Sequence, residues 1–387
     1  MKILIYSHYF APSIGGVEFI VQSLASGLAK LRTLHGDREF DVIAITEVAA
    51  ENFSDEAFPF QIVRQPGPLE LWRLVRESDV LHAAGPALLP IFFGWLMRKR
   101  VVIEHHTYQS VCPNGLLLQR PQDVVCPGHF QAGRYGECFR CLCTEVSKAS
   151  AIKRLMLMFP RYRMARAATV NLAVTKHVRD RLKLPNTTVV YHGIEDVREN
   201  GSTGAEASVV SFAYVGRFVS EKGLPILLQA CKILRNEGKD FRLQLVGDGP
   251  EREKLENIIQ REQLAPWVSI TGFLTGEMLS KAMSEVRVVV TPSICEETAG
   301  LATMEQMMRG RLVIASSIGG LREIVEGAGL LSLPGDAESL ADCMRKVIRD
   351  PTLITSFGEK GRRRAINLFE RQRMIEEHAR IYRAFAR

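Results

Sequence analysis

Two glutamates, Glu297 and Glu305, are the residues whose type and spacing most clearly indicate chemistry in this chain. A valine-rich run over 286–291 precedes them and predicts a buried parallel strand, and apolar residues at helical spacing predict a helix from about Ala299. Open α/β sheets bind ligands in the loops at the carboxyl ends of their strands. Because an ionised carboxylate accepts hydrogen bonds from neighbouring sugar hydroxyls, we interpret the pair as a sugar-binding site. Taken alone, the pattern also fits a helix-capping acid and a solvated helix residue.

Two cations, Arg217 and Lys222, follow the first strand predicted in the second half of the chain. That strand ends at Gly216, where the backbone can approach a ligand closely, and the two charges can bracket a diphosphate. The spacing is neither that of a P-loop nor that of GxGxxG, which argues against a nicotinamide cofactor. The chain has no Asp-x-Asp pair to hold a divalent ion, so we expect Arg217, Lys222 and helix amides to stabilise a departing nucleotide without a metal. A solvated turn is the alternative.

The first half of the chain contributes a glycine pair and a histidine pair. Gly15 and Gly16 lie between the first predicted strand and a helix, an arrangement that presents backbone amides to an anion. His105 and His106 follow a strand predicted over 101–104, where an imidazole could hydrogen-bond a sugar or assist proton transfer. We expect one of these two histidines to be structural.

Five of the eight cysteines lie close together, at Cys112, Cys126, Cys138, Cys141 and Cys143. Cys138 and Cys141 have the spacing of a metal knuckle, and Cys112 with Cys126 could complete a four-thiolate structural zinc site. An iron–sulfur cluster, a redox pair or simply reduced thiols would give the same pattern. The other three cysteines are scattered and are interpreted as core residues.

The composition is that of a globular protein, with 387 residues, 46% hydrophobic and 24% charged. The net charge of +7 permits an anionic partner, but no basic–aromatic array or helix-turn-helix pattern indicates nucleic acid. The N-terminus reads as a strand rather than a signal peptide, so we expect a cytoplasmic protein, with a peripheral position at the inner membrane face as an option. The basic segment 151–168 could contact an anionic membrane, or it could be an amphipathic helix packed on its domain.

Short strands alternate with helical patterns throughout, which predicts an α/β protein with two doubly wound, Rossmann-like domains facing across a cleft. The polar stretch 196–208 is the expected linker. The domains are then 1–195, with a cysteine insert at 105–148, and 209–365, followed by a C-terminal helix over 366–387 that packs across the junction. Strands are expected at 3–6, 41–46, 60–63, 80–83, 101–104, 172–174, 188–191, 209–215, 242–246, 268–271, 286–291 and 312–315.

Together these segments resemble the retaining GT-B glycosyltransferases of group 1 (family 4), and more specifically a subset with a cysteine-containing insert. The carrying motifs are PSIGGVE, YHGIE, VGRFVSEKG, LVGDGPE, SICEETAGLATMEQM and SIGGLREIV. The resemblance implies transfer of a sugar from a nucleotide-diphosphate sugar, with UDP or GDP as the nucleotide, to an acceptor hydroxyl with retained configuration. It favours His106 over His105 as the catalytic histidine. In this resemblance Glu297 contacts the donor sugar, Glu305 the ribose, and Arg217 and Lys222 the diphosphate. The full set of residues expected to bind the donor is Gly15, Gly16, Gly216, Arg217, Lys222, Glu297, Ala299, Gly300, Leu301 and Glu305.

The chain departs from the family pattern at several positions. Glu195 stands for the usual Asp, Arg322 replaces a proline, and Thr298-Ala299 occupies a Gly-Phe position, so the sugar pocket is expected to differ in shape. The acceptor is left open among a lipid-linked, a polysaccharide and a small-molecule acceptor. A GT-B epimerase, a phosphorylase and a non-catalytic nucleotide-sugar-binding protein are the alternative functions.

Overall fold

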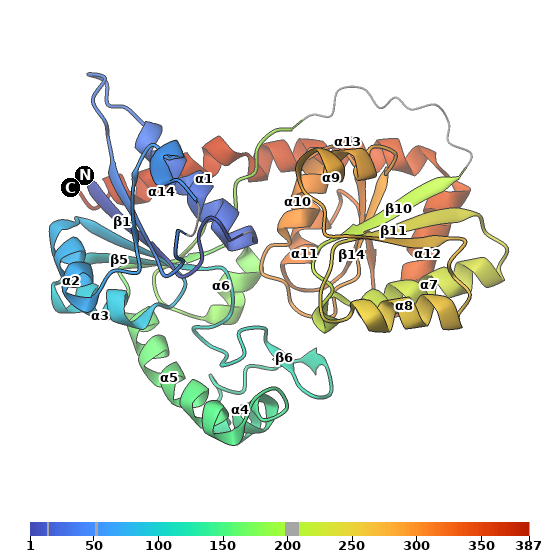
Figure 1. Cartoon of the computed structure of the whole chain (residues 1–387), viewed down its shortest axis with the longest axis horizontal. Helices are drawn as coiled ribbons and strands as arrows, with labels where there is room; N and C mark the ends of the chain where they lie inside the picture. The colour runs from blue at the N-terminus through green and yellow to red at the C-terminus, as the bar shows by residue number, and fades with distance from the viewer. Residues whose placement is uncertain (14, 51–52, 198–208, 387) are drawn as a thin grey trace. The chain divides into compact units, whose positions relative to one another are not determined.

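The computed structural model describes residues 1–13, 15–50, 53–197 and 209–386, and these form two compact α/β units (Figure 1). Unit 1 comprises Met1–Gln122, Cys126–Gly193 and Phe369–Arg387, and unit 2 comprises Asp123–Val125 and Ile194–Leu368. Residues 198–208, most of the expected linker, lie outside the described residues.

Unit 1 is built on a seven-stranded parallel sheet in the order β3-β2-β1-β4-β5-β8-β9. Strand β1 has β2 on one side and β4 on the other, so the winding reverses between β1 and β4, the place where open sheets bind ligands. The strands are β1 (Lys2–Ser7), β2 (Asp41–Thr46), β3 (Gln61–Arg64), β4 (Val80–Ala84), β5 (Arg100–His105), β8 (Val170–Ala173) and β9 (Thr187–Val189).

Helices cover both faces of this sheet. Figure 1 shows α1 (Gly16–Lys30) and α14 (Arg371–Arg383) on one face, with α2 (Pro68–Glu77) and α3 (Leu88–Leu96) on the other. Helix α1 forms because Ile20, Leu24 and Leu28 recur on one stripe, which is fully buried. Gly27 lets α14 approach α1 closely, because a side chain there would collide with Ile375. The remaining helices of the unit are α4 (Tyr135–Leu142), α5 (Lys148–Ala167) and α6 (Lys176–Leu182).

The C-terminal segment expected as one helix over 366–387 belongs to two helices. Helix α13 (Thr352–Phe369) begins earlier than expected, and α14 begins at Arg371. Between them Glu370 has extended backbone angles, φ −65° and ψ 137°, which interrupt the helical hydrogen-bond ladder. Helix α14 then packs on α1 within unit 1, so its apolar stripe belongs to that unit's core.

Unit 2 has a six-stranded parallel sheet in the order β12-β11-β10-β13-β14-β15, and its winding reverses between β10 and β13. The strands are β10 (Val210–Val215), β11 (Phe241–Val246), β12 (Val268–Gly272), β13 (Val288–Thr291), β14 (Leu312–Ser316) and β15 (Leu330–Ser332). Its helices are α7 (Leu224–Asn236), α8 (Arg252–Arg261), α9 (Gly276–Met283), α10 (Leu301–Met308), α11 (Gly319–Val325), α12 (Ala337–Arg349) and all but the last residue of α13. The expected fold class, α/β with parallel sheets, is confirmed.

Three short strands were not expected from the sequence: β6 (Leu118–Gln119), β7 (Val124–Val125) and β15. Each has only two or three residues, too few for an alternating or apolar run to be recognised.

Candidate functional site

Three loops meet at the switch point of unit 2, at the carboxyl ends of β10, β13 and β14. The Ile294 backbone N–H donates to Glu221 O at 3.0 Å, which joins the first two loops. The Gly320 N–H donates to Glu297 O at 2.7 Å, which joins the second and third. Gly223 has φ +68°, and a Cβ there would lie 2.1 Å from Pro292 O, so only glycine fits.

Lys222 and Glu297 form an ion pair across the first two loops. Lys222 Nζ lies 2.8 Å from Glu297 Oε1, and the side chains are 26% and 11% exposed. Ser293 Oγ also donates to Glu297 Oε1. The sequence assigned these two residues to different parts of a ligand, and in the structure each is the other's partner.

Each charge of the pair keeps the other residue ionised, although burial favours the neutral forms. Burial disfavours the Glu297 carboxylate, but the charge and hydrogen bond of Lys222 and the bond from Ser293 outweigh it and lower the carboxyl pKa. Burial likewise disfavours the ammonium, but the charge and hydrogen bond of Glu297, together with the interaction with Tyr214, outweigh it and raise the pKa of Lys222. The site therefore holds a preformed cation and a preformed anion at neutral pH.

Tyr214 connects Arg217 to this pair. Its hydroxyl donates to Arg217 O at 2.9 Å and interacts electrostatically with Lys222, Glu297 and Arg217. Burial is the main reason why the pKa of Tyr214 is raised, so the phenol remains neutral. The Arg217 residue itself is exposed. At Gly216, φ is +152° and a Cβ would lie 2.9 Å from the Tyr214 hydroxyl, which explains the glycine.

The other donor-site residues expected from the sequence lie at the start of α10. Ala299 is buried, and Gly300 adopts φ +67° as the residue before Leu301, where the helix begins. Glu305 is an exposed residue of α10; desolvation by the surrounding protein raises its pKa, and the charge of Arg309 opposes the shift. Among the described residues, no ion pair links Glu305 to Lys222.

In unit 1 a cavity of about 340 Å³ lies at the switch point between β1 and β4. Its lining includes Ser7, Tyr9, Gly85, His106 and Arg161. In the adjoining loop the Glu18 carboxylate lies close to Gly15, and binding of the donor by Gly15 and Gly16 stays a prediction.

The two adjacent histidines have different surroundings. His105 is sealed in the core, with Nε2 2.8 Å from Asn171 Oδ1 and Nδ1 3.1 Å from Ser110 Oγ. His106 lines the cavity, and its Nδ1 lies 3.0 Å from Nε2 of His192, whose ring is stacked on it. Burial lowers the pKa of His106, and Glu104 opposes that shift. The catalytic role of His106 stays a prediction.

The four cysteines considered for zinc, Cys112, Cys126, Cys138 and Cys141, line one small cavity. Burial raises the pKa of Cys112 to about 11 and that of Cys138 to about 12. The Arg120 N–H donates to Cys141 Sγ at 3.3 Å. In the part of the chain that the structure describes, the sulfurs do not form a set within 4.8 Å of one another.

Sequence reasoning missed several residues of these sites, among them Tyr214, Ser293, His192 and Arg161. Tyr214 belongs to a buried strand and looked like a core residue, and Ser293 looked like a strand terminator. His192 was noted only as part of a motif. The signal available for it was its position just after β9, at the same edge of the sheet as His106.

Comparisons with known proteins show which proteins this chain is similar to. Residues 210–350 match the family model "Glycosyl transferases group 1". The chain is 34% identical over 151 residues to 2-deoxystreptamine glucosyltransferase of Streptomyces kanamyceticus, covering 38% of this chain and 39% of that protein. It is 29% identical over 383 residues to a glycosyltransferase of Methanocaldococcus jannaschii, covering 94% and 92%. The match to the first of these relatives thus spans only about two fifths of that relative's length.

Solved structures extend the likeness to both units. Sucrose-phosphate synthase from Thermosynechococcus elongatus has a TM-score of 0.74 at 23% identity, over 99% of this chain and 98% of that chain. Anabaena Alr3699/HepE in complex with UDP has a TM-score of 0.75 at 18% identity, over 99% and 100%. At these identities the likeness establishes the fold, and the GT-B type expected from the sequence is confirmed.

Proposed function

We propose that the chain is a retaining glycosyltransferase that moves a sugar from a nucleotide-diphosphate sugar to an acceptor hydroxyl. The observation that carries the proposal is the Lys222–Glu297 pair at the switch point of unit 2, within the segment that matches the group 1 family. A phosphate needs a cation and a sugar needs hydrogen-bond acceptors, and this pair supplies one of each.

The donor would exchange the internal ion pair for ligand contacts. Lys222 and Arg217 would take the diphosphate, and Glu297 would accept hydrogen bonds from sugar hydroxyls. As the bond from the anomeric carbon to the phosphate oxygen breaks, negative charge grows on the diphosphate, and the two cations stabilise it there without a catalytic divalent metal. The acceptor oxygen then bonds to the anomeric carbon on the same face, which retains configuration.

The acceptor is assigned to unit 1, in the cavity lined by His106. Because burial lowers the pKa of His106, its ring is neutral near pH 7. Its Nε2, which lies 3.6 Å from Glu104 Oε2, would take the proton that the acceptor hydroxyl loses. His192 positions the ring through the contact at Nδ1. Arg161, in the same cavity, favours an acceptor that carries negative charge.

UDP and GDP are the nucleotides to test first, and the solved Alr3699/HepE complexes contain UDP or UDP-glucose. The experiment is a panel of UDP- and GDP-hexoses, with nucleotide release as the readout. We expect the wild type to release one nucleotide and Glu297→Gln to lose that activity. Glu296→Gln, a change of the neighbouring acid, is the control and retains it. No release by wild type across the panel, in the presence of mixed acceptors, would argue against the function.

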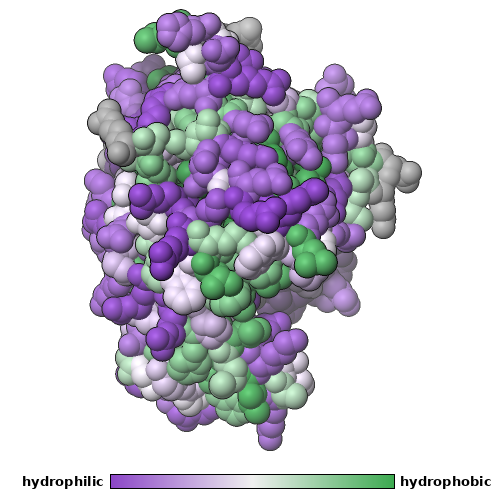
Figure 2. Space-filling view, turned by 90° about the vertical axis from the view of Figure 1, so that its left-hand side faces the viewer, coloured by the Kyte–Doolittle hydropathy of each residue, from purple (hydrophilic) through white to green (hydrophobic). Residues whose placement is uncertain are grey.

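We also propose that unit 1 contacts an anionic membrane surface through α3 and α5. A groove of about 570 Å³ there is lined by Trp95, Arg98, Lys99 and Arg163, and Trp95 is 60% exposed. Figure 2 shows hydrophobic and hydrophilic side chains intermixed on this side of the molecule. No helix among the described residues is long and apolar enough to span a bilayer.

Cosedimentation with vesicles tests the membrane proposal. Binding should require phosphatidylglycerol, should fall with salt, and should weaken in Trp95→Ser. Phe273→Ser removes an aromatic residue with 62% exposure in unit 2 and serves as the control. Equal binding to neutral vesicles, or equal loss in both variants, contradicts the proposal.

For the cysteine cavity we propose structural zinc, with Cys112, Cys126, Cys138 and Cys141 as ligands. The sulfurs would have to draw closer, because Zn–S bonds are about 2.3 Å. Metal binding would also release protons from thiols whose pKa burial raises. We expect zinc in the purified protein to fall by about one equivalent in Cys138→Ser/Cys141→Ser. An unchanged zinc content in this variant would contradict zinc at this site.

A further inference from the structure

Unit 1 contains a buried carboxylate surrounded by histidines. Glu104 on β5 is 1% exposed, and its recorded ion-pair partners in the described chain are all histidines, with no lysine or arginine among them. An isolated buried carboxylate is costly, so a positive charge must compensate it. In the mechanism proposed above Glu104 acts only through His106, whose Nε2 lies 3.6 Å from Glu104 Oε2.

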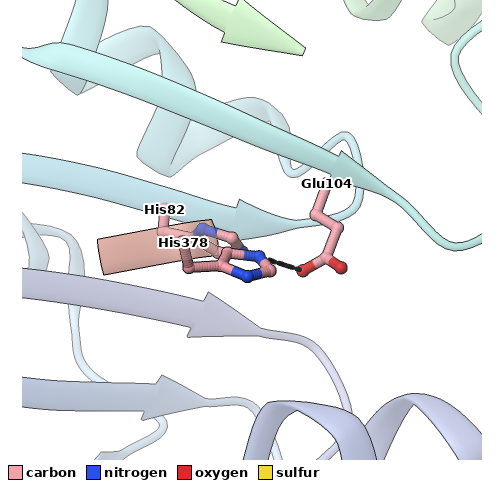
Figure 3. A group of neighbouring side chains, drawn as sticks. All are labelled: His82, Glu104 and His378. Carbon is pink, nitrogen blue, oxygen red and sulfur yellow. Dashed lines mark hydrogen bonds and ion pairs between the residues drawn. The ribbon is translucent and has the colours of Figure 1, made fainter. Parts of the chain in front are cut away.

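Three ligand atoms converge at one end of the cluster. Glu104 Oε2 lies 3.2 Å from His82 Nε2 and 3.7 Å from His378 Nε2, and these three atoms all lie within 4.8 Å of one another. Figure 3 shows the two imidazole rings side by side, both directed at the same carboxylate. Tetrahedral zinc with bonds of about 2.0–2.1 Å separates its ligand atoms by about 3.3 Å, and the observed separations bracket that value.

The second ring nitrogen of each histidine, Nδ1, already has a hydrogen-bond partner. His378 Nδ1 lies 2.8 Å from Met374 O, and since a carbonyl only accepts, Nδ1 carries the hydrogen. His82 Nδ1 lies 2.8 Å from the Tyr382 hydroxyl. A metal-bound imidazole characteristically uses its second nitrogen in this way, which orients the ring and fixes its tautomer.

In the part of the chain that is described, Nε2 of His378 and Oε1 of Glu104 lack the hydrogen-bond partners that buried polar atoms normally have. With Nδ1 protonated, a neutral His378 would point the lone pair of Nε2 at Glu104 Oε2, and two such atoms repel unless a cation lies between them. Burial disfavours a second proton on His378, but the hydrogen bond that this proton would make to Glu104 and the charge of Glu104 outweigh burial and raise the pKa of His378. The cation is therefore either that proton or a metal ion. Within the described residues, neither His378 Nε2 nor Glu104 Oε1 has a hydrogen-bond partner. Buried polar atoms are rarely left in this state.

We propose that His82, Glu104 and His378 bind a divalent transition-metal ion, with Zn²⁺ as the ion that two imidazoles and one carboxylate suit best. The ligands come from β4, β5 and α14, so the ion ties the C-terminal helix to the centre of the unit 1 sheet. Its role is structural, because the ligands are at most 1% exposed. The alternative is a proton on His378, and the test separates the two.

The experiment uses the full chain with Cys138→Ser/Cys141→Ser as background, which removes two of the four thiolates proposed as zinc ligands. After exposure to Zn²⁺ or Co²⁺ and removal of free ion, metal is counted by mass spectrometry. We expect about one equivalent, the visible absorption of tetrahedral Co²⁺ without thiolate charge-transfer bands, and a higher unfolding temperature. Less than one tenth of an equivalent, with no Co²⁺ absorption, would overturn the proposal and leave the proton as the compensating charge.

Variants then assign the ligands. Adding Glu104→Gln or His378→Gln should abolish metal binding and the temperature shift. His105→Gln is the matched control, because it removes another fully buried imidazole whose two nitrogens already have neutral partners. Metal retained in both ligand variants would overturn the assignment. If those variants fail to fold, the Co²⁺ spectrum and metal count of the background protein decide alone.

Discussion

Removing the Lys222–Glu297 pair in two different ways separates its structural role from its chemical one. Lys222→Met alone leaves a carboxylate 11% exposed without its cation. Breaking a fully buried pair costs roughly 3–5 kcal/mol, and because 26% of the Lys222 side chain is exposed we expect about 2 kcal/mol here. Lys222→Met/Glu297→Gln removes both charges, keeps similar volumes, and should be within about 1 kcal/mol of wild type in unfolding free energy.

Activity should follow a different order from stability. Both variants lose the cation that faces the leaving diphosphate, so each should release nucleotide at least about 10²-fold more slowly than wild type. Urea unfolding and nucleotide release on the same preparations provide the two readouts. The reasoning is refuted if the double variant regains wild-type turnover together with its stability, because the pair would then be purely structural.

Three further predictions concern the same site. Gly223→Ala should abolish nucleotide binding, because the added Cβ would collide with Pro292 O. The control Gly238→Ala is also at φ +68° but has nothing within 4 Å, so it should cost only about 1 kcal/mol of stability. Nucleotide titration and urea unfolding of both variants test this prediction, and equal nucleotide affinity in the two would contradict it. The pKa of Glu297 is lowered in the folded state, so the stability that its carboxylate gives the fold is fully present above the unfolded pKa of about 4.3 and is lost as pH falls through the folded pKa. The free energy of unfolding of wild type should therefore depend more steeply on pH in this acid range than that of Glu297→Gln. Identical curves would be evidence against the ion pair. Turnover should survive brief EDTA treatment, and full loss that Mg²⁺ restores would show that a divalent ion stabilises the leaving group.

The sheets of both units could be predicted from the sequence because their strands are short apolar runs separated by turn residues. Val288, Val289 and Val290 are all buried, as a strand covered on both faces requires. The break at Glu370 could not be predicted, because the apolar stripe continues on both sides of it and only the packing of α14 on α1 selects the change of direction.

The candidate site was predictable in its residue types and less so in their contacts. Lys222 and Glu297 are 75 residues apart, and the sequence does not state that the β10 and β13 loops are neighbours until the strand order is known. Gly223 carried a usable signal, since a glycine directly before a helix marks a constrained backbone position.

The histidine cluster was hidden for a similar reason. His82 and Glu104 interrupt two apolar strands, an anomaly visible in the sequence, but His378 lies 296 residues after His82 and is brought there only by α14. Long-range packing of this kind is set by the tertiary structure and has no local sequence pattern.

A crystal structure with UDP or GDP bound would show whether Lys222 and Glu297 hold the donor. We expect the diphosphate on the Gly216–Gly223 loop, within hydrogen-bonding distance of Lys222 Nζ, with Glu297 released toward the position of the sugar. A nucleotide bound elsewhere, with Lys222 and Glu297 still paired and touching no ligand atom, would contradict it.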